Sequence, residues 1–311
     1  MMKNIHPEYS LDKLCGLFGL TRQAYYQYKK RVIGNVIEEE LVIKRVLAIR
    51  KDHGRMGGRK LFHKLTTFME SHQIKMGRDA FFRLLSSHNL LVKKRKRRIF
   101  TTNSYHWLRK YPNLIKDLHL SAPNQLWVSD ITHWRCESYF LYISLITDAY
   151  SHMIVGYHIG RTLESIESVQ ALNMAIVTLS NKPNKLIHHS DRGAQYCSSI
   201  YVEVLKYNDI GISMTENGDP LENAIAERIN GILKDEYLWD QKATSLEEAK
   251  LILDRSIELY NFDRPHMSIG NLTPNEVHYG KNDIDPKRIW KSYYKKYTSQ
   301  SDMSFIRHEE F

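Results

Sequence analysis

The feature that most constrains the fold is the order of hydrophobic patterns after Pro123. Three segments alternate or run apolar as β-strands do, a helix follows, and two short strands then alternate with helices. In order, the segments are QLWVSDITHWR, SYFLYISLITDAY, HMIVGYHIG, ESIESVQALNMAIVTL, KLIHHSD, a helix near 198–208, GISMTEN, a helix within 218–238, and SLEEAKLILDRSIELYNFDRP. This order predicts an α/β domain with a mixed five-stranded sheet flanked by helices.

The chain before Pro123 has helical patterns instead. Residues 10–31 indicate two short helices around Gly19, with Thr21 capping the second. The spacing of Cys15, Gly19 and Tyr25 is typical of a helix-turn-helix, although an ordinary helical hairpin would give the same pattern. Further helices are expected over 37–52, near 58–71 and over 77–88, which indicates a second small helical unit.

Positive charge is concentrated in the first part of the chain. Residues 1–120 hold 26 lysines and arginines against 9 acids, a net +17, whereas residues 121–311 hold 19 against 26, a net −7. This asymmetry is typical of a nucleic-acid binder coupled to another activity; the alternative is a basic surface without a partner. The run Lys93, Lys94, Arg95, Lys96, Arg97 and Arg98 favours the first interpretation, because adjacent cations repel unless a polyanion is near.

Several classes of protein are not expected. No apolar run approaches the length of a membrane span, and the first residues lack the apolar stretch of a signal peptide. The three cysteines, Cys15, Cys136 and Cys197, are widely spaced, which argues for a reducing compartment and against a disulfide framework or a cysteine zinc site. We therefore expect a cytoplasmic protein.

Five acids lie between residues 218 and 238. Asp219 before Pro220 indicates a helix cap with Glu222 as its capping-box partner, and Asp235 and Glu236 are expected to be solvated. Glu227 is different, because at about 100° per residue it shares a polar stripe. The other members of the stripe are Asn223, Asn230 and Lys234, while Ile225, Ile229, Ile232 and Leu233 gather opposite and should face a core. A solvated surface charge remains the simpler interpretation unless Glu227 has partners elsewhere.

Two aspartates occur at strand positions and could be those partners. Asp130 lies inside the first predicted strand, where a buried carboxylate is costly without a counter-charge or a metal. Asp191 closes the fourth strand, where an ordinary turn aspartate is an equally good interpretation. Between Asp191 and Glu227 lie 35 residues.

Together these residues resemble a known family. Asp130, Asp191 and Glu227, with that spacing, resemble the DDE triad of retroviral-integrase-type recombinases. The surrounding words, WVSDITHW, HHSDRGAQY, ENAIAERINGILKDE and YNFDRPHMSIGNLTPNEV, resemble the OrfB transposases of bacterial insertion sequences over residues 10–280. Lys234, seven residues after Glu227, matches a basic residue of this group. Glu222 stands where the group usually has aspartate, and the histidine–cysteine zinc module of retroviral integrases is absent.

The resemblance implies an RNase H-like sheet that places Asp130 and Asp191 on adjacent strands while a helix delivers Glu227. It implies that the three carboxylates are catalytic and hold two Mg²⁺ ions, for which Mn²⁺ would substitute. Such hard cations take oxygen ligands and neutralise charge on the attacking and leaving oxygens of a phosphodiester. His133, His188 and His189 are expected to pack or contact DNA rather than bind metal, and Asp148 to accept hydrogen bonds at a strand end.

The implied activity is that of a DNA transposase, which cuts element ends and joins them to target DNA by attack of a 3′-hydroxyl. Two alternatives are a non-catalytic DNA-binding protein derived from a mobile element, and an RNase H-like nuclease that hydrolyses without joining. The resemblance also implies a homo-multimer on paired ends, a possible fusion with an upstream-frame product, and association with the bacterial nucleoid. The predicted DNA contacts are Lys234, Arg22 and Gln23, together with the basic run 93–98.

The predicted domains follow from these assignments. They are a helix-turn-helix-like DNA-binding unit at 1–35, a second helical DNA-binding unit at 36–98, a linker with some helix at 99–120, the RNase H-like catalytic core at 121–282, and a tail at 283–311. Thr273, Pro274 and Glu276 predict a further capping box. Tyr260, Arg264 and His266 could support the helix of Glu227 or touch DNA, and the sequence leaves both open.

Overall fold

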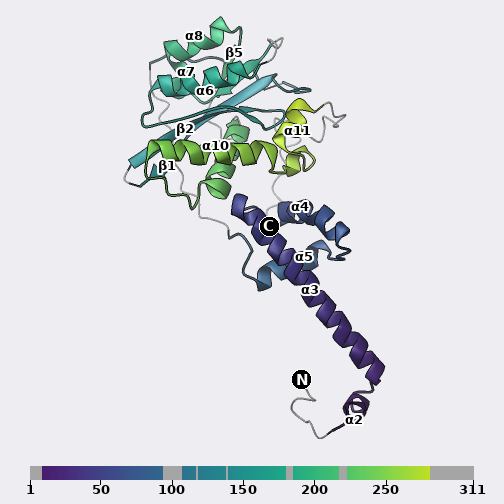
Figure 1. Ribbon diagram of the computed structural model, residues 1–311. Helices are drawn as coiled ribbons and strands as arrows, with labels where there is room; N and C mark the ends of the chain where they lie inside the picture. The colour runs from purple at the N-terminus through teal and green to yellow at the C-terminus, as the bar shows by residue number, and fades with distance from the viewer. Residues whose placement is uncertain are drawn as a thin grey trace, which may run out of the picture. The chain divides into compact units, whose positions relative to one another are not determined.

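The computed structural model describes residues 9–93, 107–116, 118–137, 139–179, 185–216 and 223–280. The chain divides into two compact units, residues 1–94 and 95–311, which run from purple to blue and from blue to yellow in Figure 1. Three predicted features lie outside the described residues: the basic run from Lys94 onward, the cap of Asp219 with Glu222, and the tail 283–311. The predicted domain boundaries therefore stay predictions.

The first unit consists of helices. They are α2 (Leu11–Gly16), α3 (Arg22–Asp52), α4 (Gly58–Ser71) and α5 (Arg78–Ser87). The turn between α2 and α3 forms as predicted, because Gly19 takes a left-handed φ of 66° and the Thr21 side chain accepts a hydrogen bond from the Ala24 N–H.

The predicted break between the second helix and the helix over 37–52 is wrong. A single helix, α3, runs through both segments for 31 residues. No proline interrupts the segment, and one glycine, Gly34, costs a helix only about 1 kcal/mol relative to alanine. The C-terminal half of α3 also packs into the core of this unit, where buried side chains from three helices meet. These include Val42 and Val46 of α3, Leu61 and Leu65 of α4, and Phe81 and Leu85 of α5.

The second unit contains the predicted mixed sheet. Its strands are β1 (Leu126–Cys136), β2 (Tyr139–Asp148), β3 (Ile154–Gly160), β4 (Ile187–Ser190) and β5 (Gly211–Met214), in the order β3-β2-β1-β4-β5. The first three strands pair antiparallel, while β4 pairs parallel with both β1 and β5. The five predicted strands are all present, which confirms the α/β class and the mixed sheet.

Helices cover both faces of this sheet, as Figure 1 shows. On one face pack α6 (Ser165–Val177), α7 (Ala194–Cys197) and α8 (Ser199–Tyr207). On the other pack α9 (Ala224–Ile232), the π-helical turn η2 (Leu233–Tyr237) and α10 (Leu246–Phe262). The chain then passes through η3 (Met267–Ile269) and α11 (Pro274–Tyr279), whose predicted capping box between Thr273 and Glu276 is confirmed. This arrangement is the predicted RNase H-like fold.

Of the predicted linker 99–120, the structure describes residues 107–116 and 118–120. These residues contain no helix, and part of the segment lies along β5, where the Met214 N–H donates to the Pro112 carbonyl. Helix α9 begins at Ala224 with Asn223 as its cap, and Glu227 lies in its first turn. The Asn223 side chain donates to the Ser129 carbonyl at 3.0 Å, which anchors the start of the helix to β1. None of the described helices has the length and apolar character needed to cross a membrane.

Gly156 in β3 lets α6 pack directly on the sheet. A Cβ there would lie 2.2 Å from the Ala171 carbonyl oxygen of α6, whereas a Cβ at Gly231 of α9 would meet no atom within 4 Å. We expect Gly156→Ala to lower the free energy of unfolding by about 1–3 kcal/mol through overpacking. Gly231→Ala is the matched control and should raise it by about 0.5–1 kcal/mol. Urea unfolding measures both, and equal effects of the two substitutions would contradict this account of the packing.

Candidate active site

Asp130 lies in β1, and Asp191 directly follows β4, the parallel strand beside β1. Ser129 of β1 pairs with Ser190 of β4, and each aspartate is the next residue along its chain. The register therefore brings the two carboxylates to corresponding positions at neighbouring strands, although 60 residues separate them in the sequence. The Asp191 carboxylate also accepts a hydrogen bond from the Gly193 N–H at 3.0 Å, which fixes the turn into α7.

The Asp130 carboxylate lies in a strongly perturbed environment. It accepts hydrogen bonds from the Asn230 side chain at 2.7 Å and from the Ile131 N–H at 2.9 Å. Burial raises the pKa of Asp130 to about 7, and the negative charges of Asp191 and Glu227 add to the increase. The two hydrogen bonds act in the opposite direction by favouring the ionised form. Both of the other carboxylates are therefore near enough to Asp130 to raise its pKa.

Two members of the polar stripe of α9, Asn223 and Asn230, face β1. Asn223 and Asn230 are both about 5% exposed, and each donates its side-chain N–H to β1, whereas the Glu227 side chain is exposed. The opposite side is buried as predicted at Ile229, Ile232 and Leu233. The sequence analysis assigns no role at the site to these asparagines. Their spacing from Glu227 on the same helix stripe is the pattern from which such a role could have been inferred.

The donor atoms of the three carboxylates suit a hard divalent cation. All are oxygens, and Asp191 and Glu227 place negative charge near the buried Asp130 carboxylate, which a bound cation would offset. The buried Oδ1 atom of Asn230 has no hydrogen-bond partner, so it could accept from a water of such an ion. Within the described residues, no three acidic, histidine or cysteine side chains converge tightly enough to form a ready-made metal cage. The residues therefore fit the predicted ions in kind and in charge, without a closed coordination sphere.

Three histidines lie in the two strands beside the carboxylates, and all three contact neighbouring side chains. His188 is buried between Ser129 Oγ at 2.7 Å and the Tyr201 hydroxyl at 2.9 Å, and burial lowers its pKa to about 3. His189 is also buried and lies 2.8 Å from Ser213 Oγ. His133 packs edge-to-face against Phe140. His188 and His189 are thus held in the interior by these contacts.

Asp148 accepts hydrogen bonds at the end of β2, as predicted. Its buried carboxylate accepts from the Asn124 N–H, the Ser151 N–H and the Ser151 hydroxyl, each at 2.7 Å. These bonds close the turn between β2 and β3, so Asp148 already has a sufficient structural role.

Lys234 lies in η2, directly after α9, and is partly buried. Burial lowers the pKa of His133 on β1, and the nearby Lys234 ammonium lowers it further. The lysine is therefore close to the strand that carries Asp130, on the side of the sheet that α9 covers.

The expectation that Glu236 is a solvated charge is wrong. Its carboxylate accepts two hydrogen bonds from the Arg264 guanidinium, at 2.8 Å from Nε and 2.7 Å from Nη2. The Arg264 side chain is 1% exposed and that of Glu236 is 14% exposed. A buried guanidinium requires such a partner, and no sequence pattern joined these residues, because they are 28 positions apart.

The predicted DNA contacts of the first unit lie at the start of α3. Arg22 and Gln23 are its first two residues and are exposed, and they line a shallow hollow of about 550 Å³ with Tyr26, Gln27 and Lys30. Arg22 is also paired with Asp12 of α2 at 3.3 Å. Lys93 is exposed, and the rest of the basic run lies outside the described residues.

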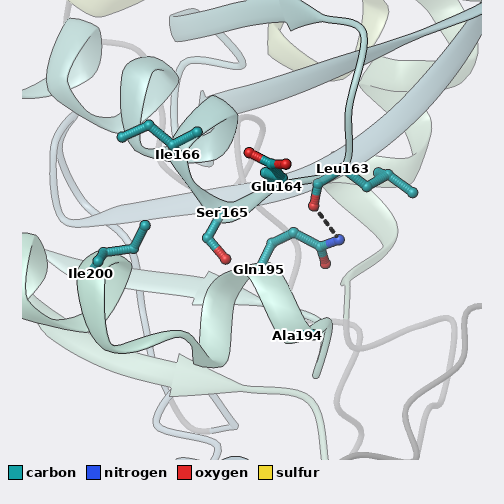
Figure 2. Close-up of a pocket in the computed structure, with 7 residues that line it drawn as sticks. All are labelled: Leu163, Glu164, Ser165, Ile166, Ala194, Gln195 and Ile200. Carbon is teal, nitrogen blue, oxygen red and sulfur yellow. Dashed lines mark hydrogen bonds between the residues drawn. The ribbon is translucent and has the colours of Figure 1, made fainter.

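A second hollow, of about 360 Å³, opens beside the start of α7. Figure 2 shows its lining by the first turn of α6, the start of α7 and Ile200 of α8. The Gln195 side chain donates to the Leu163 carbonyl at 2.9 Å across it. The Gly193 N–H that binds the Asp191 carboxylate precedes Ala194, so the turn at Asp191 leads into one wall of the hollow.

Asn230→Ala tests the hydrogen bond to Asp130. We expect it to weaken the binding of Mn²⁺ or Mg²⁺ by about 10–100-fold, because the bond orients a candidate ligand. Calorimetric titration of the metal measures the effect. The matched control is Asn173→Ala on the exposed side of α6, which should leave metal affinity unchanged. Equal affinities for the Asn230→Ala variant and the unaltered chain would show that this bond only stabilises α9.

Comparisons with known proteins show which family the chain resembles. Residues 121–220 and 208–274 each match a family described as "Integrase core domain". The chain is 33% identical over 263 residues to the insertion element IS600 31 kDa protein of Shigella sonnei, covering 84% of this chain and 96% of that protein. It is 24% identical over 284 residues to the transposase for insertion sequence element IS629 of Shigella sonnei, covering 89% and 94% respectively. Among solved structures, the HTLV-2 integrase catalytic core in complex with magnesium matches with a TM-score of 0.41 at 22% identity, over 51% of this chain and 98% of that one.

Proposed function

The chain belongs to the OrfB-type transposases of bacterial insertion sequences, and on this premise we propose that it cuts the ends of such an element and joins them to target DNA. The reaction is a metal-dependent transfer in which a DNA 3′-hydroxyl attacks a phosphodiester. One observation supports this most: the register of β1 and β4 brings Asp130 beside Asp191, and Glu227 adds to the same negative field.

In this proposal Asp130, Asp191 and Glu227 are the catalytic residues and hold two Mg²⁺ ions, with Mn²⁺ as a substitute. Bound there, the ions would neutralise charge on the attacking and leaving oxygens. Asn230 keeps the Asp130 carboxylate oriented through its 2.7 Å hydrogen bond. Asn223 holds the start of α9 against the Ser129 carbonyl, so that Glu227 approaches from the helix side of the sheet.

DNA is the proposed partner of both units. Arg22 and Gln23 would contact bases from the start of α3, and the run 93–98 would neutralise phosphates in a sequence-independent way. Lys234 would hold a phosphate close to the carboxylates. We further propose a homo-multimer on paired element ends, with a fusion to an upstream-frame product as a possible active form, at the nucleoid in the cytoplasm.

The test of this function is incubation of the purified chain with candidate element-end DNA and Mg²⁺. Nicked ends together with joined products would support the proposal. Binding without products would favour the non-catalytic alternative, and cleavage without joining would favour a nuclease. A fusion of this chain with the upstream-frame product should be assayed in parallel. It would reveal whether that product is needed for joining.

Lys234→Ala is expected to reduce strand transfer through weaker DNA engagement, with partial recovery at low salt, where the remaining phosphate contacts strengthen. Lys234→Arg should retain much of the activity, because a point contact with phosphate requires charge more than fork geometry. Strand transfer across a salt series, with metal titration alongside, measures both variants. Unchanged transfer by Lys234→Ala at every salt concentration would assign the lysine to the protein surface only. A sharply raised Mg²⁺ requirement with unaltered DNA affinity would place its role in arranging the carboxylates.

A further inference from the structure

We infer that the buried ion pair between Glu236 and Arg264 is a positioning device that sets the orientation of α9, and with it the direction of Glu227 and Lys234. Only the expected effect on strand transfer rests on the proposed function, since the orientation of α9 can be measured without any reaction.

The pair is attached to the element that continues α9. Glu236 lies in η2, a π-helical turn in which the Leu238 N–H donates to the Leu233 carbonyl at 3.0 Å. A π turn holds more residues than an α turn, so it changes the direction of the side chains around it, and such turns are frequent at functional sites. Lys234 belongs to this turn, and Glu227 precedes it by less than two α-helical turns.

Arg264 is in turn fixed by its surroundings. Its Nη1 lies 2.8 Å from His266 Nε2, and its guanidinium lies 5.9 Å from the centre of the Tyr260 ring. The Tyr260 hydroxyl donates to the His152 carbonyl at 2.9 Å, in the turn between β2 and β3. Arg264 therefore connects η2 to the sheet through the end of α10. In this way the segment 260–266, YNFDRPH, supports the helix of Glu227, which is one of the two roles that its sequence left open.

The charged hydrogen bonds between Glu236 and Arg264 fix the orientation of η2. Burial alone would lower the pKa of Arg264, but the hydrogen bonds and charge of Glu236 reverse the effect and raise it, so the cation depends on this carboxylate. The buried apolar side chains of η2, Leu233 and Tyr237, also hold the turn in the core. Apolar packing has little directional preference, whereas two parallel N–H···O bonds fix both distance and rotation.

The test replaces both partners, because removing one would leave a buried charge and could unfold the chain. In Glu236→Met/Arg264→Met the volume is kept and folding should persist, which urea unfolding verifies. The orientation of α9 is read from spin labels at Arg228→Cys on α9 and Glu203→Cys on α8, both exposed positions, while the three native cysteines are buried. The matched control is Arg255→Met/Glu258→Met, which removes an exposed pair of 2.8 Å on α10.

We expect the interlabel distance distribution to shift or broaden in the Glu236/Arg264 double variant and to stay unchanged in the control. Without labels, the double variant should also lose about 10²-fold in strand transfer, the scale of a displacement near 1 Å at reacting groups. An unchanged distribution in a folded double variant would overturn the inference, whatever its activity. If the double variant does not fold, Arg264→Lys, which keeps the charge but not the fork, must broaden the distribution. If the unaltered chain joins no DNA, the proposed function fails while the distance result still decides this inference.

Discussion

Asp130→Asn, Asp191→Asn and Glu227→Gln should each reduce cleavage and joining of DNA by at least about 10³-fold, on the scale seen when one member of a cooperating catalytic set is removed. The reason is that each carboxylate supplies negative oxygen ligands that a neutral amide replaces poorly. DNA affinity should change little, since the predicted contacts of Lys234, Arg22, Gln23 and the run 93–98 are kept in each variant, and each variant should still fold. The measurement is a single-turnover assay on end DNA, with binding measured separately.

Two exposed acids of the same unit serve as controls for these substitutions. Asp209→Asn and Glu203→Gln remove the same charge from surface positions, and both variants should retain full activity. Asp209 has a left-handed φ of 57°, a conformation that asparagine adopts readily. Full activity in any one of the three site variants would remove that residue from the catalytic set.

Binding of the full chain to DNA should depend steeply on salt. If residues 1–120 neutralise about six phosphates, the logarithm of the binding constant should fall with the logarithm of salt concentration at a slope near −5, following about −0.9 per phosphate. Affinity should then fall by about 10³-fold between 50 and 200 mM salt. Fluorescence anisotropy with labelled duplex DNA over this range provides the measurement.

Two sets of variants separate charge from sequence reading. Replacing Lys94, Lys96 and Arg98 by glutamine should make the slope shallower by about 0.9 for each phosphate that is no longer neutralised, for all DNA sequences alike. Replacing Arg22 or Gln23 should relax sequence preference more than replacing Lys96 does, because these residues begin the proposed recognition helix. A flat salt response of the unaltered chain would exclude the basic segment as the DNA footprint.

The strands and the unusual position of Asp130 could be predicted because their signals are local, whereas the family resemblance singled out Asp191 and Glu227. Alternating hydrophobicity marks each strand, and Asp130 interrupts an apolar strand where only a special environment stabilises a carboxylate. The pairing of β1 with β4 could not be obtained from those patterns alone; the family resemblance supplied it. The excess of positive charge in residues 1–120 could also be predicted from the sequence. The continuity of α3 could not, because its second half is stabilised by packing against α4 and α5.

The support around the carboxylates depends on pairs far apart in the chain. Asn230 appeared only as a member of a polar stripe, and its partner Asp130 is 100 residues away. Glu236 looked like a surface acid because its partner, Arg264, lies beyond a second helix. Asn223 shows the same limitation, since its partner, the Ser129 carbonyl, is 94 residues away. Local propensity cannot encode such contacts, which arise only when the helix docks on the sheet.

The most direct test of the central claim is joining by a pre-cleaved element end that carries either a 3′-hydroxyl or a 3′-deoxy terminus. With Mg²⁺, the unaltered chain should join the 3′-hydroxyl end to target DNA and should not join the 3′-deoxy end. Joining should also disappear in Asp130→Asn and when the metal is chelated. Joining of the 3′-deoxy end, or joining that persists without a divalent metal, would contradict a mechanism in which three carboxylates hold the ions for attack by a DNA 3′-hydroxyl.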